Sequence, residues 1–167
     1  MIEWNDGPKN RWIATNEASH KLMSLKIIPQ CCIVSFLTSH LAFFEEEFSD
    51  KHSDDFNENI HQKFLNELND EVDKIIVVCK ELSKLESKEI NEIVSFVFDI
   101  MEDDMTEQRN AEKIMSNIGI SFEDPDFNEK MAKAYYEGKF PKLKDSLKKC
   151  AINARTIMSK YIVKELP

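Results

Sequence analysis

Apolar residues recur every three or four positions along most of the chain, which is the spacing of one face of an α-helix. The longest stripe predicts about 30 residues of helix ending at Leu82. Its members are Phe56, Ile60, Phe64, Leu68, Val72, Ile75, Ile76, Cys79 and Leu82. Shorter stripes predict helices over about residues 9–26 and from Pro29 to about Phe48. The pattern is typical of an all-α protein.

The helix near residues 30–48 differs from the others because it is apolar on most of its sides. A helix of this kind belongs at the centre of a bundle. The eighteen residues from Ile27 to Phe44 carry no charge, which is the lower limit of length for a membrane span. Pro29 and several polar residues within them lower the tendency to insert, so we expect a buried helix and no membrane.

A fourth stripe predicts a helix from about residue 90 to 105. The side chains that it places on the buried face are Ile90, Ile93, Val94, Val97, Phe98, Met101 and Met105. Thr106 is suited to cap a separate, shorter helix that ends at Asn117. Gly119 is then available for a left-handed C-terminal cap.

Other helix ends are marked by capping residues, glycine and proline. We expect an N-cap at Ser53, a capping box from Ser83 to Glu86, and an N-cap followed by a first-turn proline at Asp124-Pro125. Gly138 ends that helix after Tyr135, and Pro141 begins the last one. The sequence therefore predicts one domain over residues 1–167, a bundle of about six to seven helices.

Composition agrees with this architecture. Three glycines and five prolines in 167 residues leave few turns for a β fold. The four cysteines include the adjacent pair Cys31-Cys32 and no C-x-x-C, so we expect reduced thiols. Residues 1–11 are polar and show no secretory signal. Together these features favour a cytoplasmic protein.

Charge is sorted along the chain, whose net charge is −9. Residues 1–40 carry four basic and three acidic side chains, residues 41–129 carry eight and 25, and residues 130–167 carry ten and three. The acidic runs in the middle of the chain are either solvated helix ends that keep the protein soluble or a surface that attracts a basic partner. In both cases an acidic surface repels nucleic acid. We predict that the partner contacts its densest acidic runs and two tyrosines: Glu45, Glu46, Glu47, Asp50, Asp54, Asp55, Glu58, Glu102, Asp103, Asp104, Tyr135 and Tyr136.

No pattern in the chain identifies a catalytic, cofactor or metal site. His20, His40 and His61 lie on three predicted helices and would bind a metal only if all three faced inward at one level. There is no glycine-rich phosphate loop and no G-x-S-x-G elbow. Glu89 and Glu92 have the E-x-x-E spacing of magnesium-dependent helical nucleotide hydrolases, and Asp99 follows, but a second carboxylate pair at suitable spacing is missing.

The sequence therefore favours a protein without enzymatic activity and without a cofactor. The leading hypothesis is an acidic cytosolic immunity or antitoxin-type protein that binds and neutralises a basic, nuclease-like toxin or effector. The alternatives are a helical accessory subunit of a larger complex and a magnesium-dependent all-α nucleotide hydrolase. No direct binding of nucleic acid is expected.

Overall fold

A computed structural model describes residues 7–52, 57–121 and 123–162, and within them the chain forms six α-helices and no strand. The predicted all-α bundle is confirmed. The helices are α1 (Gly7–Leu25), α2 (Cys31–Lys51), α3 (Glu58–Leu82), α4 (Ser87–Asn117), α5 (Phe127–Tyr136) and α6 (Pro141–Ile162).

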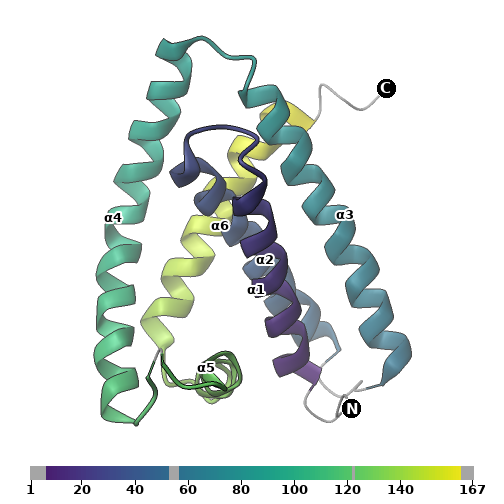
Figure 1. Cartoon of the computed structure of the whole chain (residues 1–167), viewed down its shortest axis with the longest axis vertical. Coiled ribbons are helices and arrows are strands. Elements are labelled where there is room, and N and C mark those ends of the chain that lie inside the picture. Colours follow the sequence, from purple (N-terminus) through teal and green to yellow (C-terminus); the bar gives the residue numbers. More distant parts are fainter. Residues whose placement is uncertain (1–6, 53–56, 122, 163–167) are drawn as a thin grey trace.

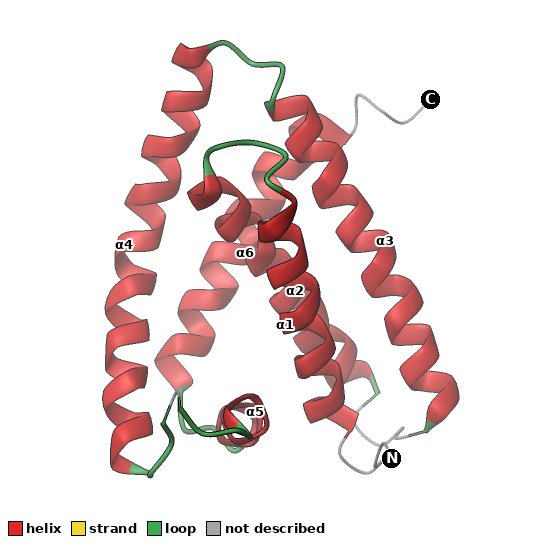
Figure 2. Ribbon diagram, in the orientation of Figure 1, coloured by secondary structure: helices red, strands yellow, loops and turns green. Residues whose placement is uncertain are grey.

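Helix α2 lies at the centre of the bundle, as its apolar composition predicts. It packs against α1, α3, α4 and α6. Figure 1 shows α3 and α4 diverging from their connection to opposite sides of the molecule, with α1, α2 and α6 between them. Helix α5 lies across one end, and the loops between described helices are short (Figure 2). No described helix is long and apolar enough to cross a membrane.

The core consists of a large cluster around α2 and a smaller one at the α5 end. The large cluster has at its centre residues that are almost completely buried: Ile33, Phe36, Leu37, Leu41, Phe64, Ile75, Val78 and Val97. The smaller cluster joins the end of α4 to α5 and the start of α6 through Ala111, Met115, Ala134 and Phe140. Helix α5 is therefore held by its own apolar contacts as well as by α1.

The connection between α2 and α3 differs from the sequence prediction. Helix α2 continues to Lys51, past its predicted end at about Phe48, because Phe48 and Ser49 are buried and remain helical. Helix α3 begins at Glu58, and Asn57 is its N-cap, whose side-chain oxygen accepts a hydrogen bond from the Ile60 amide at 3.0 Å. The cap predicted at Ser53 lies outside the described residues.

Helix α4 is one continuous helix of 31 residues, so the predicted division at Thr106 is wrong. The Thr106 hydroxyl donates to the Glu102 carbonyl at 3.3 Å, a bond within the helix that removes the need for a cap there. The capping box predicted from Ser83 to Glu86 is also absent. Ser83 is the C-cap of α3, and Glu86 precedes α4 without a side-chain capping bond.

The remaining helix ends agree better with prediction. Gly119 and Gly138 adopt φ angles of 81° and 77°, the left-handed conformation expected after α4 and α5. Pro141 is the first residue of α6, as predicted. Helix α5 instead begins later than predicted, at Phe127, because the Asp124 carboxylate is bound to the Ser121 amide and to Lys130.

Candidate functional site

The three consecutive glutamates of α2 were predicted to contact a partner, and the structure shows that each contacts a different part of the chain. Successive residues of a helix point about 100° apart, so Glu45, Glu46 and Glu47 cannot share one face. Glu45 and Glu46 are buried, and Glu47 is half-exposed. The acidic run therefore contributes to interhelical contacts rather than forming a continuous exposed patch.

Glu45 belongs to a buried polar chain that links α1 to α2. The Arg11 Nε donates to the Ser49 hydroxyl at 3.0 Å, and that hydroxyl donates to the Glu45 carboxylate at 2.9 Å. Both charged side chains are about 1 % exposed. The Arg11 guanidinium also lies 5.5 Å from the centre of the Phe48 ring. Burial of opposite charges in one hydrogen-bonded chain compensates part of their desolvation.

Glu46 connects α2 to α5 and α6. Its carboxylate accepts a hydrogen bond from the Tyr135 hydroxyl at 3.1 Å and pairs with Lys144 Nζ at 3.0 Å. Burial and the negative charge of Glu46 raise the pKa of Tyr135, so the phenol remains protonated. The hydrogen bond to Glu46 raises the pKa of Lys144. Tyr135 is thus occupied within the fold, although it was predicted as a partner contact.

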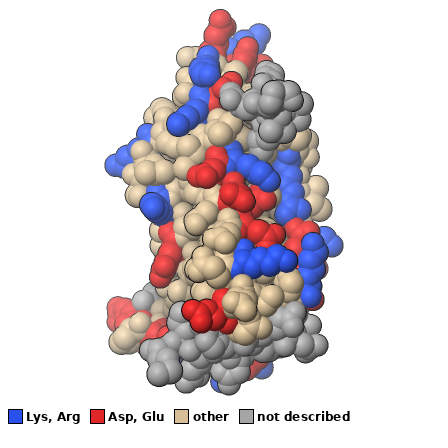
Figure 3. Space-filling model, turned by 90° about the vertical axis from the view of Figure 1, so that its right-hand side faces the viewer, with Lys and Arg blue, Asp and Glu red and all other residues tan. Residues whose placement is uncertain are grey.

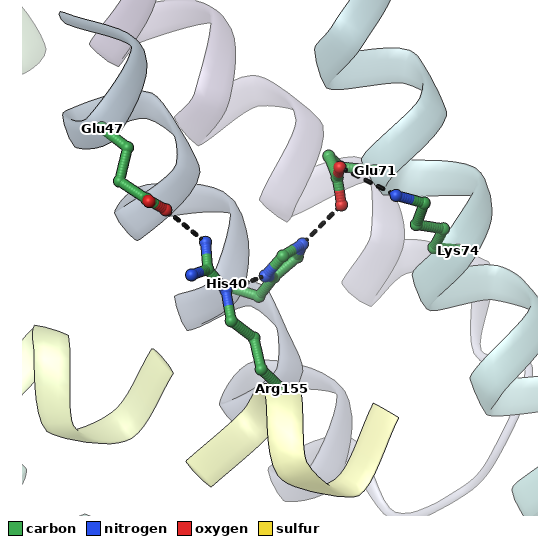
Figure 4. Close-up of polar contacts among 5 residues, drawn as sticks. All are labelled: His40, Glu47, Glu71, Lys74 and Arg155. Carbon is green, nitrogen blue, oxygen red and sulfur yellow. Dashed lines mark hydrogen bonds and ion pairs between the residues drawn. The ribbon is translucent and has the colours of Figure 1, made fainter. Parts of the chain in front are cut away.

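Glu47 is the first member of a chain of polar contacts that crosses from α2 to α6 and α3 (Figure 4). It accepts a hydrogen bond from Arg155 at 2.5 Å, and Arg155 Nε donates to His40 Nδ1 at 2.9 Å. His40 Nε2 lies 2.6 Å from the Glu71 carboxylate, which also binds Lys74 at 3.0 Å. The hydrogen bond from His40 is the main reason that the pKa of Glu71 falls to about 2.

This chain of contacts engages both ring nitrogens of His40. A guanidinium only donates, so Nδ1 must accept and carries no proton. Nε2 then donates a hydrogen bond to Glu71, so both ring nitrogens are occupied within the fold. A general base needs a nitrogen within reach of a substrate proton. The geometry therefore assigns His40 a structural role that joins three helices.

The same residues form one wall of a cavity of about 550 Å³ between α2, α3 and α6. Besides His40, Glu71 and Arg155, its lining includes the basic side chains Lys51, Lys63 and Lys74. Its apolar lining is Phe44, Phe48 and Met158. None of the lysines in this lining had been singled out from the sequence, because they are separated along the chain and only the packing of α2 on α3 brings them together.

The other predicted contact residues are distributed over the surface or lie outside the described part. Asp50, Glu58 and Glu102 are exposed. Asp54 and Asp55 lie outside the described residues. Asp103, Asp104 and Tyr136 are within helices, but their side chains are not described. On the α3 side of the molecule, acidic and basic side chains are interleaved (Figure 3), so this face does not present one sign of charge.

Helix α4 presents a different surface. Phe98 and Met105, which the sequence pattern placed on the buried face, are 56 % and 47 % exposed, so that prediction was wrong for these two residues. Val97 is completely buried, and the residue after it points about 100° away from the core. Met105 follows Phe98 by seven residues, which is two helical turns, so it lies on the same side.

Two stripes of mixed character run along the exposed side of α4, and we call them together the α4 surface. One stripe is Glu92, Phe96 and Asp99, and the other is Phe98, Glu102 and Met105. Both have the i, i+4, i+7 spacing of one helix face. All six side chains are exposed. Three of the six, Glu92, Asp99 and Glu102, are acidic and none is basic, so this surface is negative.

The metal arrangements considered from the sequence are not formed. His20 is exposed on α1, and His40 faces Glu71. His61 lies on α3, where burial and the nearby Arg11 charge lower its pKa. In the described parts of the chain, no group of three or more His, Cys, Asp or Glu side chains is placed to hold a metal ion.

The carboxylates considered for magnesium are exposed on α4. Glu92 and Asp99 are seven residues apart, a rise of about 10 Å along the axis, and they belong to no described group of three or more side chains that could hold a metal ion. Comparison of the chain with protein-family models, with curated proteins and with solved structures finds no match.

Proposed function

We propose that this chain is a non-enzymatic inhibitor that binds a basic protein through the α4 surface. The observation that carries the proposal is the exposure of Phe96, Phe98 and Met105 among acidic side chains. Phe98 and Met105 share one side of the helix, and Phe96 lies on the other side of buried Val97. Exposed apolar side chains with charged residues around them are typical of protein interfaces. The function class remains the one that the sequence favours, an immunity or antitoxin-type protein.

The apolar side chains would provide most of the binding energy. Large apolar anchors that become buried at the centre of an interface account for most of the affinity of protein complexes. Phe98 has the largest exposed fraction among the exposed large apolar side chains of the described chain. It would enter a pocket of the partner, and Met105 would extend the contact by two turns of the same helix.

The acidic side chains would select the partner and steer its approach. The α4 surface has no basic residue within its length, and the whole chain has a net charge of −9. A strongly negative surface accelerates association with a positive one and disfavours other partners. Enzymes that act on nucleic acid have positive surfaces that contact phosphates, so they fit this description. Covering such a surface would block access of the nucleic acid.

The geometry at His40 supports a function without catalysis, since the most convergent polar cluster within the described residues has its histidine nitrogens and carboxylates engaged with one another. The accessory-subunit alternative would use the same apolar side chains. It differs in its salt dependence, because an interface held by buried apolar area is less sensitive to ionic strength than one held by exposed charges.

Affinity capture followed by an activity assay tests the proposal. The tagged chain, Phe98→Ser/Met105→Ser and Asp99→Lys/Glu102→Lys would be incubated with host extract at low and high salt, and bound proteins identified by mass spectrometry. Two matched controls alter sites outside the α4 surface. Ile152→Ser removes an apolar side chain on α6 that is 52 % exposed, and Asp70→Lys/Asp73→Lys reverses two exposed charges on α3.

We expect to capture a basic protein that still binds both control variants and does not bind either α4 variant. High salt should weaken its binding to the unmodified chain. Its purified activity should fall when the chain is added in equimolar amount. A captured protein whose binding is unchanged in both α4 variants would exclude the α4 surface as the interface. A partner that binds through α4 and keeps its full activity would exclude inhibition and favour the accessory-subunit alternative.

A further inference from the structure

The cavity between α2, α3 and α6 is not explained by a protein interface on α4. Figure 1 shows α4 on the opposite side of the molecule from α3, which forms one wall of the cavity. Its volume of about 550 Å³ is within the range of about 300–1,000 Å³ of small-molecule sites. We therefore considered what chemistry its lining would bind.

The charges of the lining divide into pairs and unpaired groups. Arg155 pairs with Glu47, and Lys74 pairs with Glu71 (Figure 4), so these four charges compensate one another. Lys51 and Lys63 also line the cavity, are exposed, and form no ion pair with a described residue. With Glu67 as its third carboxylate, the lining has four basic and three acidic side chains, so the cavity is slightly positive in a chain with a net charge of −9.

The remaining lining provides an apolar wall and one acceptor. Phe44 is half-buried, and its ring is stacked on Phe64 with 5.6 Å between the ring centres. Phe48 and Met158 are buried next to it. Glu67 has one carboxylate oxygen that is buried and has no hydrogen-bond partner in the described chain. A carboxylate in that condition needs a donor.

We propose that this cavity binds a small phosphate monoester that carries an aromatic ring and hydroxyl groups, the chemistry of a nucleoside monophosphate. The phosphate, with a charge of about −1.5 to −2, matches the ammonium groups of Lys51 and Lys63. The ring packs against Phe44. A sugar hydroxyl donates to Glu67, whose side chain turns toward the cavity to accept it.

Titration with adenosine monophosphate as the probe tests this inference. Binding would be followed by calorimetry and by amide chemical shifts, with inorganic phosphate and adenosine as separate arms. The site variant is Lys51→Glu/Lys63→Glu, and the matched control is Lys80→Glu/Lys88→Glu, which reverses two exposed lysines of α3 and α4 outside the cavity. Circular dichroism checks that each variant is folded. If Lys51→Glu/Lys63→Glu does not fold, the double variant Lys51→Gln/Lys63→Gln takes its place.

The expected result is saturable binding of adenosine monophosphate, with amide chemical-shift changes confined to residues of α2, α3 and α6. The site variant should weaken this binding about tenfold or more, because two positive charges that attract the phosphate become negative charges that repel it, and the control should not. Three results would overturn the proposal: no saturation at millimolar probe, equal affinity in the site variant, or equal affinity for inorganic phosphate or adenosine alone. None of them bears on the α4 surface, whose variants leave the cavity intact.

Discussion

The strongest single prediction concerns the Glu71 carboxylate, which receives hydrogen bonds from His40 and Lys74. Its pKa falls from the ordinary 4.5 to about 2 because the hydrogen bond from His40 favours the ionised form. At about 1.4 kcal/mol for each pKa unit, this difference corresponds to at most about 3.5 kcal/mol of stability at neutral pH. The carboxylate is 18 % exposed, so most of this contribution escapes screening by water.

The sign of the pH dependence follows from the direction of the pKa change. The folded protein holds Glu71 ionised more strongly than the unfolded chain does, so its contribution is fully present above pH 4.5. It is lost as the pH falls from about 4.5 to about 2, because the unfolded chain then takes up a proton that the folded protein binds less readily.

The perturbation is Glu71→Gln, which keeps the shape and removes the charge. We expect the free energy of unfolding at pH 7 to fall by about 2 kcal/mol, less than the full figure because the amide oxygen still accepts from His40. Urea unfolding followed by circular dichroism at pH 7, 5, 4 and 3 measures this difference. The difference in free energy of unfolding between wild type and variant should decrease steadily below pH 5.

Asp73→Asn is the matched control, since Asp73 is an exposed carboxylate on the same helix. It should change the free energy of unfolding by less than about 0.5 kcal/mol at every pH. A gap for Glu71→Gln that is constant from pH 7 to pH 3 would refute the reasoning, because a lost packing or steric contact does not titrate.

Three further predictions concern single positions. Phe64→Ala removes a completely buried aromatic ring and should lower the free energy of unfolding by about 3–5 kcal/mol. Phe98→Ala removes an exposed ring and should change it by less than about 1 kcal/mol. Equal urea midpoints for the two variants would contradict the assigned burial. Gly138→Ala should lower thermal stability by about 1 kcal/mol, because an alanine at φ 77° is strained, and an unchanged melting temperature would argue against that conformation. Burial raises the pKa of Cys79 to about 11, so native iodoacetamide labelling at pH 8, read by mass spectrometry, should modify exposed Cys31 much faster; similar rates would refute the burial.

The helices that rest on long apolar stripes were predictable from local sequence. The stripe ending at Leu82 became α3, and the uncharged segment before Phe44 became part of the central α2. In both cases the apolar residues outnumber what a surface helix needs, so burial decides the structure. The two glycines with positive φ were predictable for a similar reason, because few other residues adopt that conformation without strain.

Helix ends and continuity were harder to predict because they depend on weak local preferences. Thr106 has a hydroxyl that can cap a helix or bond back within one, and the sequence does not distinguish the two. Asp124 and Pro125 look like the start of a helix, but the contact of Asp124 with Lys130 holds the chain in a turn until Phe127. In each case a competing hydrogen bond decided the outcome.

The site could be predicted only in part because its partners are distant in sequence. Nothing near Glu46 or Glu47 indicates that Lys144 and Arg155, about a hundred residues later, neutralise them. The exposure of Phe98 likewise depends on α4 lying at the edge of the bundle, where α2 and α6 are its main neighbours. The acidic stretch around it was visible in the sequence, and the apolar anchors within it were not.

The contacts of the three glutamates in α2 make that helix sensitive to length as well as to composition. Deleting one residue between residues 34 and 44 would turn the segment after it by about 100° relative to the segment before it. The side chains of Ser49, Glu46 and Glu47 would then all turn away from their partners on the other helices, which are Arg11, Tyr135 with Lys144, and Arg155. Substitution at one glutamate removes one connection, whereas a single deletion removes the contacts to α1, α5 and α6 at once. The central helix is therefore a part of the chain where insertions and deletions should be tolerated least, even at positions whose side chains are exposed.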